Sequence, residues 1–170
     1  MSELERWVSA SEIGPGGLRL HIEAGPAELK ALAKRYRVPA VLRLEAEVEL
    51  RPVGRARFRL SGRVKARLRQ LCVVTLDELE NDVAEDFEVD FDPNAEVSAE
   101  TETEIDFDAE AEDPPEPLID GRIPVGEMVA QHLALAIDPY PRAPDAVLEA
   151  DSAEPEVSSQ SPFAILRKLS

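Results

Sequence analysis

Two adjacent stretches of this sequence alternate apolar and charged residues with a period of two, and this pattern restricts the folds open to the chain. The first stretch, VLRLEAEVEL, covers residues 41–50. Such regular alternation is strong evidence for a strand with one buried face and one exposed face. The residues predicted to face the core are Leu42, Leu44, Ala46, Val48 and Leu50.

The second stretch, RARFRLSGRVKARLRQLC, covers residues 55–72 and carries a basic side chain at most of its odd positions. We call these residues the basic stripe: Arg55, Arg57, Arg59, Arg63, Lys65, Arg67 and Arg69. The even positions, such as Phe58, Leu60 and Val64, form the apolar side. Ser61 and Gly62 interrupt a long strand, so we expect a bend, a bulge or a close backbone approach there.

A third alternating stretch, DVAEDFEVDFD, covers residues 82–92 and places acids on its outer side. The three stretches therefore predict a meander of an acidic, a basic and an acidic strand. A further strand is expected in LRLHIEAG, residues 18–25. Helices are expected from Pro26 to a point before Pro39, and within residues 123–144, where Pro139 stops the helix. The predicted class is α+β, an antiparallel β-meander with two main helices and an acidic loop.

The composition of the chain predicts its division into segments. Residues 1–144 are expected to form a single α+β domain, in which residues 93–117 are an acidic, partly irregular loop. Residues 145–160 are polar and rich in Ser and Glu, which is typical of a disordered linker. The last residues, 161–170, read SPFAILRKLS and form a short apolar and basic C-terminal tag.

The net charge of −16 limits the kinds of partner. Such a chain repels polyanions at long range, which argues against indiscriminate nucleic-acid binding and favours basic protein partners. The first residues lack the basic and apolar regions of a signal peptide. No apolar stretch approaches the roughly 20 residues that span a bilayer. We therefore expect a soluble cytoplasmic protein with no membrane partner.

Few residues are suited to catalysis or to metal binding. Cys72 is the only cysteine, so it excludes an intramolecular disulfide and a multi-cysteine zinc site. His21 and His132 stand in no recognisable catalytic context, and Cys72 is expected to be structural. A calcium loop after residue 90 is excluded, because Ala95 and Thr101 replace its required glycine and glutamate. We expect no catalytic residues, no metal and no cofactor.

The basic stripe has two interpretations. It either contacts phosphates or pairs with acids of the neighbouring strands, where each pair contributes about 0.2–1 kcal/mol. The alternation of sign between strands favours pairing, and Phe58 lies on the apolar side, unable to stack on bases. RNA contact stays open, because an arginine between two carboxylates can still donate outward. The expected pairs are Glu49–Arg55, Glu47–Arg57 and Glu45–Arg59 on one side, and Asp82–Arg69, Asp86–Lys65 and Glu88–Arg63 on the other.

One segment, LSGRVKARLRQLCVVTLDELENDVAEDFEVDFDP, resembles the YceD family of large ribosomal RNA subunit accumulation proteins, and most of all its proteobacterial branch, with Q-x-C-V-V-T-L. The ending SPFAILRKL is similar to the family's N-P-F-A-x-L-x-x-L. Gly62, Cys72, Pro162 and Phe163 stand at motif positions. Many members carry a second cysteine three residues after the first, where this chain has Thr75, so the resemblance carries over no metal or redox role.

The resemblance implies a small, cytoplasmic, non-enzymatic protein that supports the synthesis, processing or stability of large-subunit (23S) rRNA during ribosome biogenesis. Its partner would be this rRNA or its precursor particle, and direct contact is left open. The alternative, which the composition favours, is an acidic protein whose surface over residues 77–120 escorts a basic large-subunit ribosomal protein. The rRNA would then be affected only indirectly.

Overall fold

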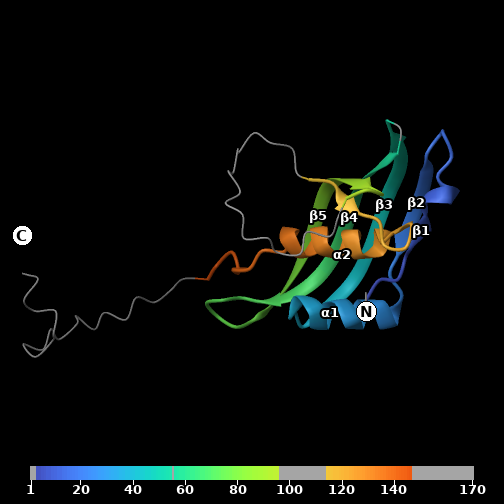
Figure 1. Cartoon of the computed structure of the whole chain (residues 1–170). Coiled ribbons are helices and arrows are strands. Elements are labelled where there is room, and N and C mark those ends of the chain that lie inside the picture. Colours follow the sequence, from blue (N-terminus) through green and yellow to red (C-terminus); the bar gives the residue numbers. More distant parts are fainter. Residues whose placement is uncertain (1–2, 55, 96–113, 147–170) are drawn as a thin grey trace, which may run out of the picture.

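The main body of the molecule is a twisted sheet of long antiparallel strands (Figure 1). The computed structural model describes residues 3–54, 56–95 and 114–146. The strand order is β2-β3-β4-β5-β6, and only the short β5–β6 pairing is parallel. The strands are β2 (Leu18–Glu23), β3 (Ala40–Val53), β4 (Arg57–Leu71), β5 (Glu78–Asp92) and β6 (Glu116–Pro117).

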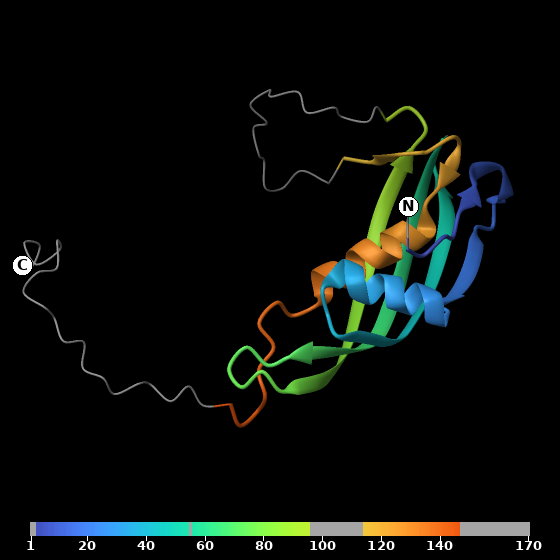
Figure 2. The ribbon, with the colours of Figure 1, turned by 90° about the horizontal axis from the view of Figure 1, so that it is seen from below.

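Two helices, α1 (Pro26–Tyr36) and α2 (Val125–Ala136), lie on the same face of this sheet (Figures 1 and 2). The core forms between them and the apolar side chains of the strands. Leu32 of α1 and Leu133 of α2 are fully buried with Leu44, Leu60 and Val64. The predicted α+β meander is therefore confirmed, and the other face of the sheet is left to the charged side chains.

The start of the chain closes one end of the core. Strand β1 (Val8–Ser9) pairs with β7 (Arg122–Ile123), and a short 3₁₀ helix (Ala10–Glu12) follows β1. Just before β1, the Gly126 N–H of α2 donates to the Arg6 carbonyl at 3.0 Å. A Cβ on Gly126 would lie 1.9 Å from the Leu4 carbonyl oxygen, so only glycine permits this approach.

One core-facing prediction for β3 is wrong. Leu42 was expected inside, but 37% of its surface is exposed, whereas Val41 is only 6% exposed. The pairing with β4 shifts between Val41 and Arg43, which is a β-bulge. At a bulge, two residues of one strand lie opposite a single residue of the next strand. The alternation of faces is therefore interrupted, and the amino-acid pattern of the strand does not reveal the interruption.

Gly62 lies where β4 passes closest to its neighbours. Strand β4 continues through Ser61 and Gly62 in unbroken register with β5, so there is no bulge at this point. A Cβ on Gly62 would lie 2.7 Å from Val48 Cγ1 and 2.8 Å from the Glu47 carbonyl oxygen. Of the three alternatives for this position, the close backbone approach is the correct one.

Much of the predicted division into segments falls outside the described residues. This applies to most of the acidic loop, to nearly all of the linker, and to the C-terminal tag with Pro162 and Phe163. The division into domain, linker and tag therefore stays a prediction.

We expect Gly62→Ala to lower the free energy of unfolding by about 1–3 kcal/mol, because the added methyl group forces β3 and β4 apart. Urea denaturation measures the change. Gly16→Ala is the control, since a Cβ there meets nothing within 4 Å. Equal stability of the two variants would contradict the close approach.

Candidate functional site: the charged face of the sheet

The face of the sheet away from the helices carries rows of opposite charge, and we call it the charged face. The described members of the basic stripe lie on it, and Arg55 falls outside the described residues. Strand β5 places acids on the same face at every second position except Ala84. We call these residues the acidic row: Glu78, Glu80, Asp82, Asp86, Glu88, Asp90 and Asp92.

The arginines of the stripe pair with the acidic row. Arg59 makes the best-formed contact, donating from Nε and Nη2 to the two carboxylate oxygens of Asp90 at 2.7 and 2.8 Å. Bidentate contacts of this kind fix the relative orientation of the two side chains as well as stabilising the pair. The other pairs are Arg57–Asp92 at 2.8 Å, Arg59–Glu88 at 3.0 Å, Arg63–Asp86 at 3.6 Å, Arg67–Glu80 at 3.3 Å, Arg67–Asp82 at 3.9 Å, Arg69–Glu80 at 3.1 Å and Arg69–Glu78 at 3.9 Å.

The predicted register between β3 and β4 is wrong by six residues. Glu49 lies opposite Ser61 rather than Arg55, because β3 continues past Pro52 to Val53 before the chain turns. The other two predicted pairs fail for the same reason. The shift is an even number, so the side chains beyond the bulge at Leu42 keep their predicted faces. In the structure Glu47 lies opposite Arg63, and Glu45 lies opposite Lys65.

The register between β4 and β5 differs from the prediction by two residues. Asp82 lies opposite Arg67, and Asp86 lies opposite Arg63. The turn between the strands determines this register: the Cys72 N–H donates to the Asp77 carbonyl at 2.9 Å. Leu76 adopts a left-handed φ of 64° within the turn. Glu88 then lies opposite Ser61.

Two glutamates of β3, Glu45 and Glu49, are paired with arginines outside the stripe. Glu49 accepts from Arg19 at 2.9 Å and from Arg51 at 3.0 Å. These two guanidinium groups, Arg51 first, lower the pKa of Glu49. Glu45 is paired with Arg43. The stripe is therefore neutralised by β5, and β3 contributes less than the sequence suggested.

Lys65 is the exception within the described part of the stripe, because it forms no ion pair there. Its neighbours across the strands are Glu45, which Arg43 already holds, and Ala84, which interrupts the acidic row. A hollow of about 360 Å³ lies here on the charged face. Its lining includes Arg43, Lys65, Arg67 and Asp82. An ammonium group in this position is available to an anionic group from outside.

The carboxylates at the end of β5 are held in the ionised form. The hydrogen bonds from Arg59 lower the pKa of Asp90 below its ordinary value. The Asn94 N–H and then Arg57 do the same for the pKa of Asp92. These contacts stabilise the fold at neutral pH. Arg57 and Arg59 are therefore already engaged in ion pairs within the protein when no partner is bound.

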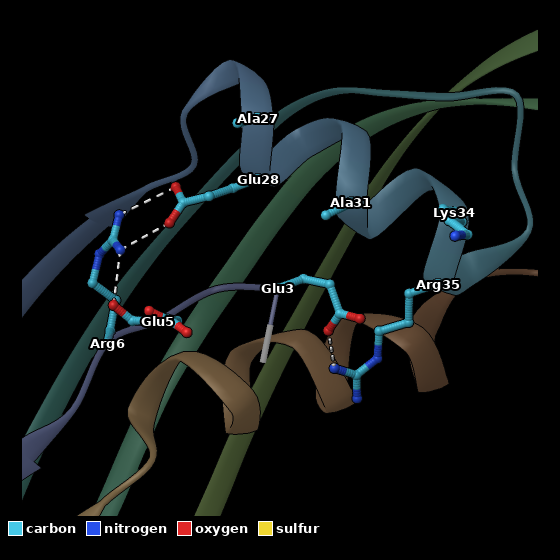
Figure 3. Close-up of a pocket in the computed structure, with 8 residues that line it drawn as sticks. All are labelled: Glu3, Glu5, Arg6, Ala27, Glu28, Ala31, Lys34 and Arg35. Atoms are coloured by element: carbon cyan, nitrogen blue, oxygen red, sulfur yellow. Dashed lines mark hydrogen bonds and ion pairs between the residues drawn. The ribbon is translucent and has the colours of Figure 1, made fainter. Parts of the chain in front are cut away.

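A separate hollow of about 810 Å³ lies between the first residues of the chain and α1 (Figure 3). Arg6 is paired with Glu28 at 2.8 Å, and Arg35 with Glu3 at 2.8 Å. Arg35 also pairs with Glu127 of α2 at 2.6 Å. The network fastens the start of the chain to both helices. It was missed from the sequence because it joins residues without a shared periodicity.

Cys72 is fully buried and lies between two segments. Its Sγ accepts hydrogen bonds at 3.4 Å from the N–H groups of Thr75 and Ala143. The Thr75 side chain, followed by these N–H groups, lowers the pKa of the thiol to about 6. The Thr75 contact lies within the turn after β4, and the Ala143 contact holds this turn against the segment that follows α2. Burial closes the thiol to a substrate, which favours the structural role.

The histidines and the acids do not add a catalytic or metal centre to the described residues. His132 stacks on Phe87 with ring centroids 4.6 Å apart, and burial lowers its pKa. His21 is exposed on the charged face. In the part of the chain that the structure describes, no three His, Cys, Asp or Glu side chains are grouped to hold a metal. No described helix is long and apolar enough to cross a bilayer.

Comparison with known protein families shows which family the chain belongs to. The family model described as "Large ribosomal RNA subunit accumulation protein YceD" matches residues 60–170. The chain belongs to the YceD family. No curated protein and no solved structure gives a significant match. The YceD match includes β5, α2 and nearly all of β4, and therefore most of the basic stripe and the whole acidic row.

In this YceD chain, Asp90→Asn should remove the two-pronged contact with Arg59 and cost about 0.5–1 kcal/mol at neutral pH. The folded-state pKa of Asp90 is lowered, so its contribution is present above the ordinary value of 3.8 and is lost as the pH falls through the folded value. The difference between the proteins should therefore shrink in acid. Denaturation at several pH values measures it.

Asp145→Asn is the control for that comparison, because Asp145 is exposed and forms no ion pair with the described residues. Its stability should match the wild type at each pH. A constant deficit of Asp90→Asn from neutral pH down to acid would contradict an electrostatic role for the pair.

Proposed function

We propose that this YceD protein is a non-enzymatic accessory factor of ribosome biogenesis. In the cytoplasm, it supports the synthesis, processing or stability of 23S rRNA. The family match is the observation that carries this proposal, because the family is described by large-subunit rRNA accumulation. The burial of Cys72 and its distribution of hydrogen bonds between two segments support a structural rather than a catalytic thiol.

The charged face supports only a limited direct contact with RNA. An arginine already paired with a carboxylate releases few counterions when a phosphate approaches. The hollow at Lys65 is the favourable place, since its ammonium group is unpaired among the described residues and Arg43 and Arg67 lie beside it. RNA contact through this face would therefore be local and would depend strongly on one residue.

The alternative is that the protein escorts a basic large-subunit ribosomal protein and affects rRNA indirectly. The exposure of the acidic row favours this candidate. The side chains of Asp82 and Asp86 are 79% and 72% exposed, and Glu88 is 56% exposed. Such carboxylates retain much of their capacity to bind a cationic partner.

The two candidates are separated by affinity capture of the tagged full-length protein from cross-linked cells, with and without RNase. The proposed function predicts enrichment of precursor 23S rRNA and the loss of protein partners after RNase. Retention of a basic ribosomal protein after RNase, with no enrichment of rRNA, would overturn direct association with RNA and favour the escort.

Lys65→Glu tests the hollow. We expect the variant to melt within a few degrees of the wild type, because Lys65 forms no ion pair with described residues, and to lose capture of rRNA. Arg67→Glu should lower stability instead, since Arg67 lies between Glu80 and Asp82. Lys30→Glu on the exposed side of α1 is the control of equal charge change. Unchanged rRNA capture by Lys65→Glu would contradict RNA contact at this position.

A further inference from the structure

The outer edge of β5 is a long strand edge with little to pair with. On one side β5 pairs with β4 from Glu78 to Phe91. On the other side it pairs with β6 only at Phe91 and Asp92. From Glu78 to Asp90, no described strand covers this second side. Every second residue therefore directs its backbone N–H and C=O away from the sheet.

This edge lacks most of the features by which proteins protect such strands. Edge strands are usually short, bulged, interrupted by proline or equipped with lysine. Residues 78–90 contain neither proline nor lysine, and their pairing with β4 has no register shift. The acidic row is what prevents self-association, because a second copy of β5 would bring carboxylates against carboxylates. The same row attracts a strand of opposite charge.

The two faces of β5 define what such a strand must look like. On the charged face it offers the acidic row. On the helix-covered face it offers the partly buried apolar side chains of Leu79, Val83 and Val89, with the polar Asn81 and the exposed Glu85 between them. A complementary strand alternates basic and apolar residues. Strand β4 has this pattern, RFRLSGRVKARLRQL, and it occupies the other edge of β5.

There is open space beside the edge at two places. A hollow of about 370 Å³ is lined by Asn81, Asp82, Val83, Ala84 and parts of the segment after α2. A second hollow, of about 570 Å³, is lined by Glu88, Val89 and Asp90 together with Pro114, Glu116 and His132. Both are lined by residues of β5 together with one residue of β4, Gln70 in the first and Arg59 in the second, so each lies on the surface of the β4–β5 pair next to the free edge.

We propose that β5 binds an extended segment of a partner protein by strand addition, and that this segment alternates lysine or arginine with apolar residues. The main-chain hydrogen bonds would supply affinity and the acidic row would supply specificity. The inference rests on the proposed function, because it provides the rRNA accumulation factor with a partner of the escort type. The exposed carboxylates of Asp82, Asp86 and Glu88 are the selecting groups.

The direct test is binding of the full-length protein to a labelled peptide of about ten residues that alternates lysine and valine. The control peptide has the same composition with all the lysines first. Fluorescence anisotropy should show that the alternating peptide binds at least about tenfold more tightly, because only it places every lysine on one face of a strand. Equal affinity for the two peptides would mean non-specific charge attraction and would overturn the inference.

Amide hydrogen exchange identifies the site of binding. The alternating peptide should slow exchange at every second residue between Glu78 and Asp90 and leave β2, the opposite edge of the sheet, unchanged. Protection already present in the free protein would mean that another part of the same chain covers this edge, and would overturn the inference. Protection at β2 alone would do the same.

The matched variants have equal net charge. The first carries Asp82→Asn, Asp86→Asn and Glu88→Gln, and should bind the alternating peptide about tenfold more weakly, since it loses three cross-strand charge pairs. The control carries Glu5→Gln, Glu23→Gln and Asp145→Asn at exposed positions away from β5 and should bind as the wild type does. Thermal melts confirm that both variants are folded.

The outcomes also separate this inference from the proposed function. If the alternating peptide fails to bind while precursor 23S rRNA is still captured, strand addition is wrong and the role in rRNA accumulation stands. If the peptide binds as expected and no rRNA is captured, direct association with rRNA is wrong and the protein-binding edge stands.

Discussion

The pairing of the basic strand β4 with the acidic strand β5 is the interaction on which the rest of the structure depends. Burial alone specifies the faces of these strands, but it does not specify their register, because a slip of two residues leaves every apolar side chain inside. The choice among even registers falls to the turn at residues 72–77 and to the charge pairs, of which Arg59–Asp90 is the best formed. Each exposed pair contributes little energy. Together the pairs favour one register over competing registers that bury the same apolar side chains.

Burial determines the faces of the strands, whereas the turn and the charge pairs determine their register. This difference explains which features could be predicted from the sequence and which could not. Alternation predicted β2, β3, β4 and β5 and, apart from Leu42, the faces of their side chains, because burial determines that pattern. The prolines near the helix ends predicted both helices. The predicted registers were wrong by six and by two residues, which are both even numbers. The alternating pattern repeats every two residues, so it cannot distinguish registers that differ by an even number of residues. The extension of β3 past Pro52 and the exposure of Leu42 at the bulge are set by contacts between strands. The network joining Glu3, Arg35 and Glu127 was equally hidden, since it forms only after the chain ends and helices have packed.

The same pairing decides how the charged face meets other molecules. In isolation, the basic stripe is typical of a phosphate-binding strand. In the sheet, its described arginines already donate to the acidic row, and Lys65 beside Ala84 is left without an ion pair in the described structure. Gly62 and Cys72, for which the resemblance predicts motif positions, lie within this framework. Gly62 allows β3 and β4 to approach, and Cys72 fixes the turn that determines the register of β5. Their contacts are structural, and the carboxylates of Asp82, Asp86 and Glu88 stay exposed on the same face.

A basic protein partner would reconcile the acidic charge of the whole protein with its role in rRNA accumulation. A chain of net charge −16 approaches RNA against electrostatic repulsion. A partner rich in lysine and arginine is attracted to the same chain, and once bound it neutralises the acidic row. Strand β5 presents that row beside an open edge, whereas β2, at the other end of the sheet, is short and carries Arg19 and Glu23 in mixed order. This asymmetry between the two edges is the reason that the proposed strand addition is assigned to β5 and not to β2.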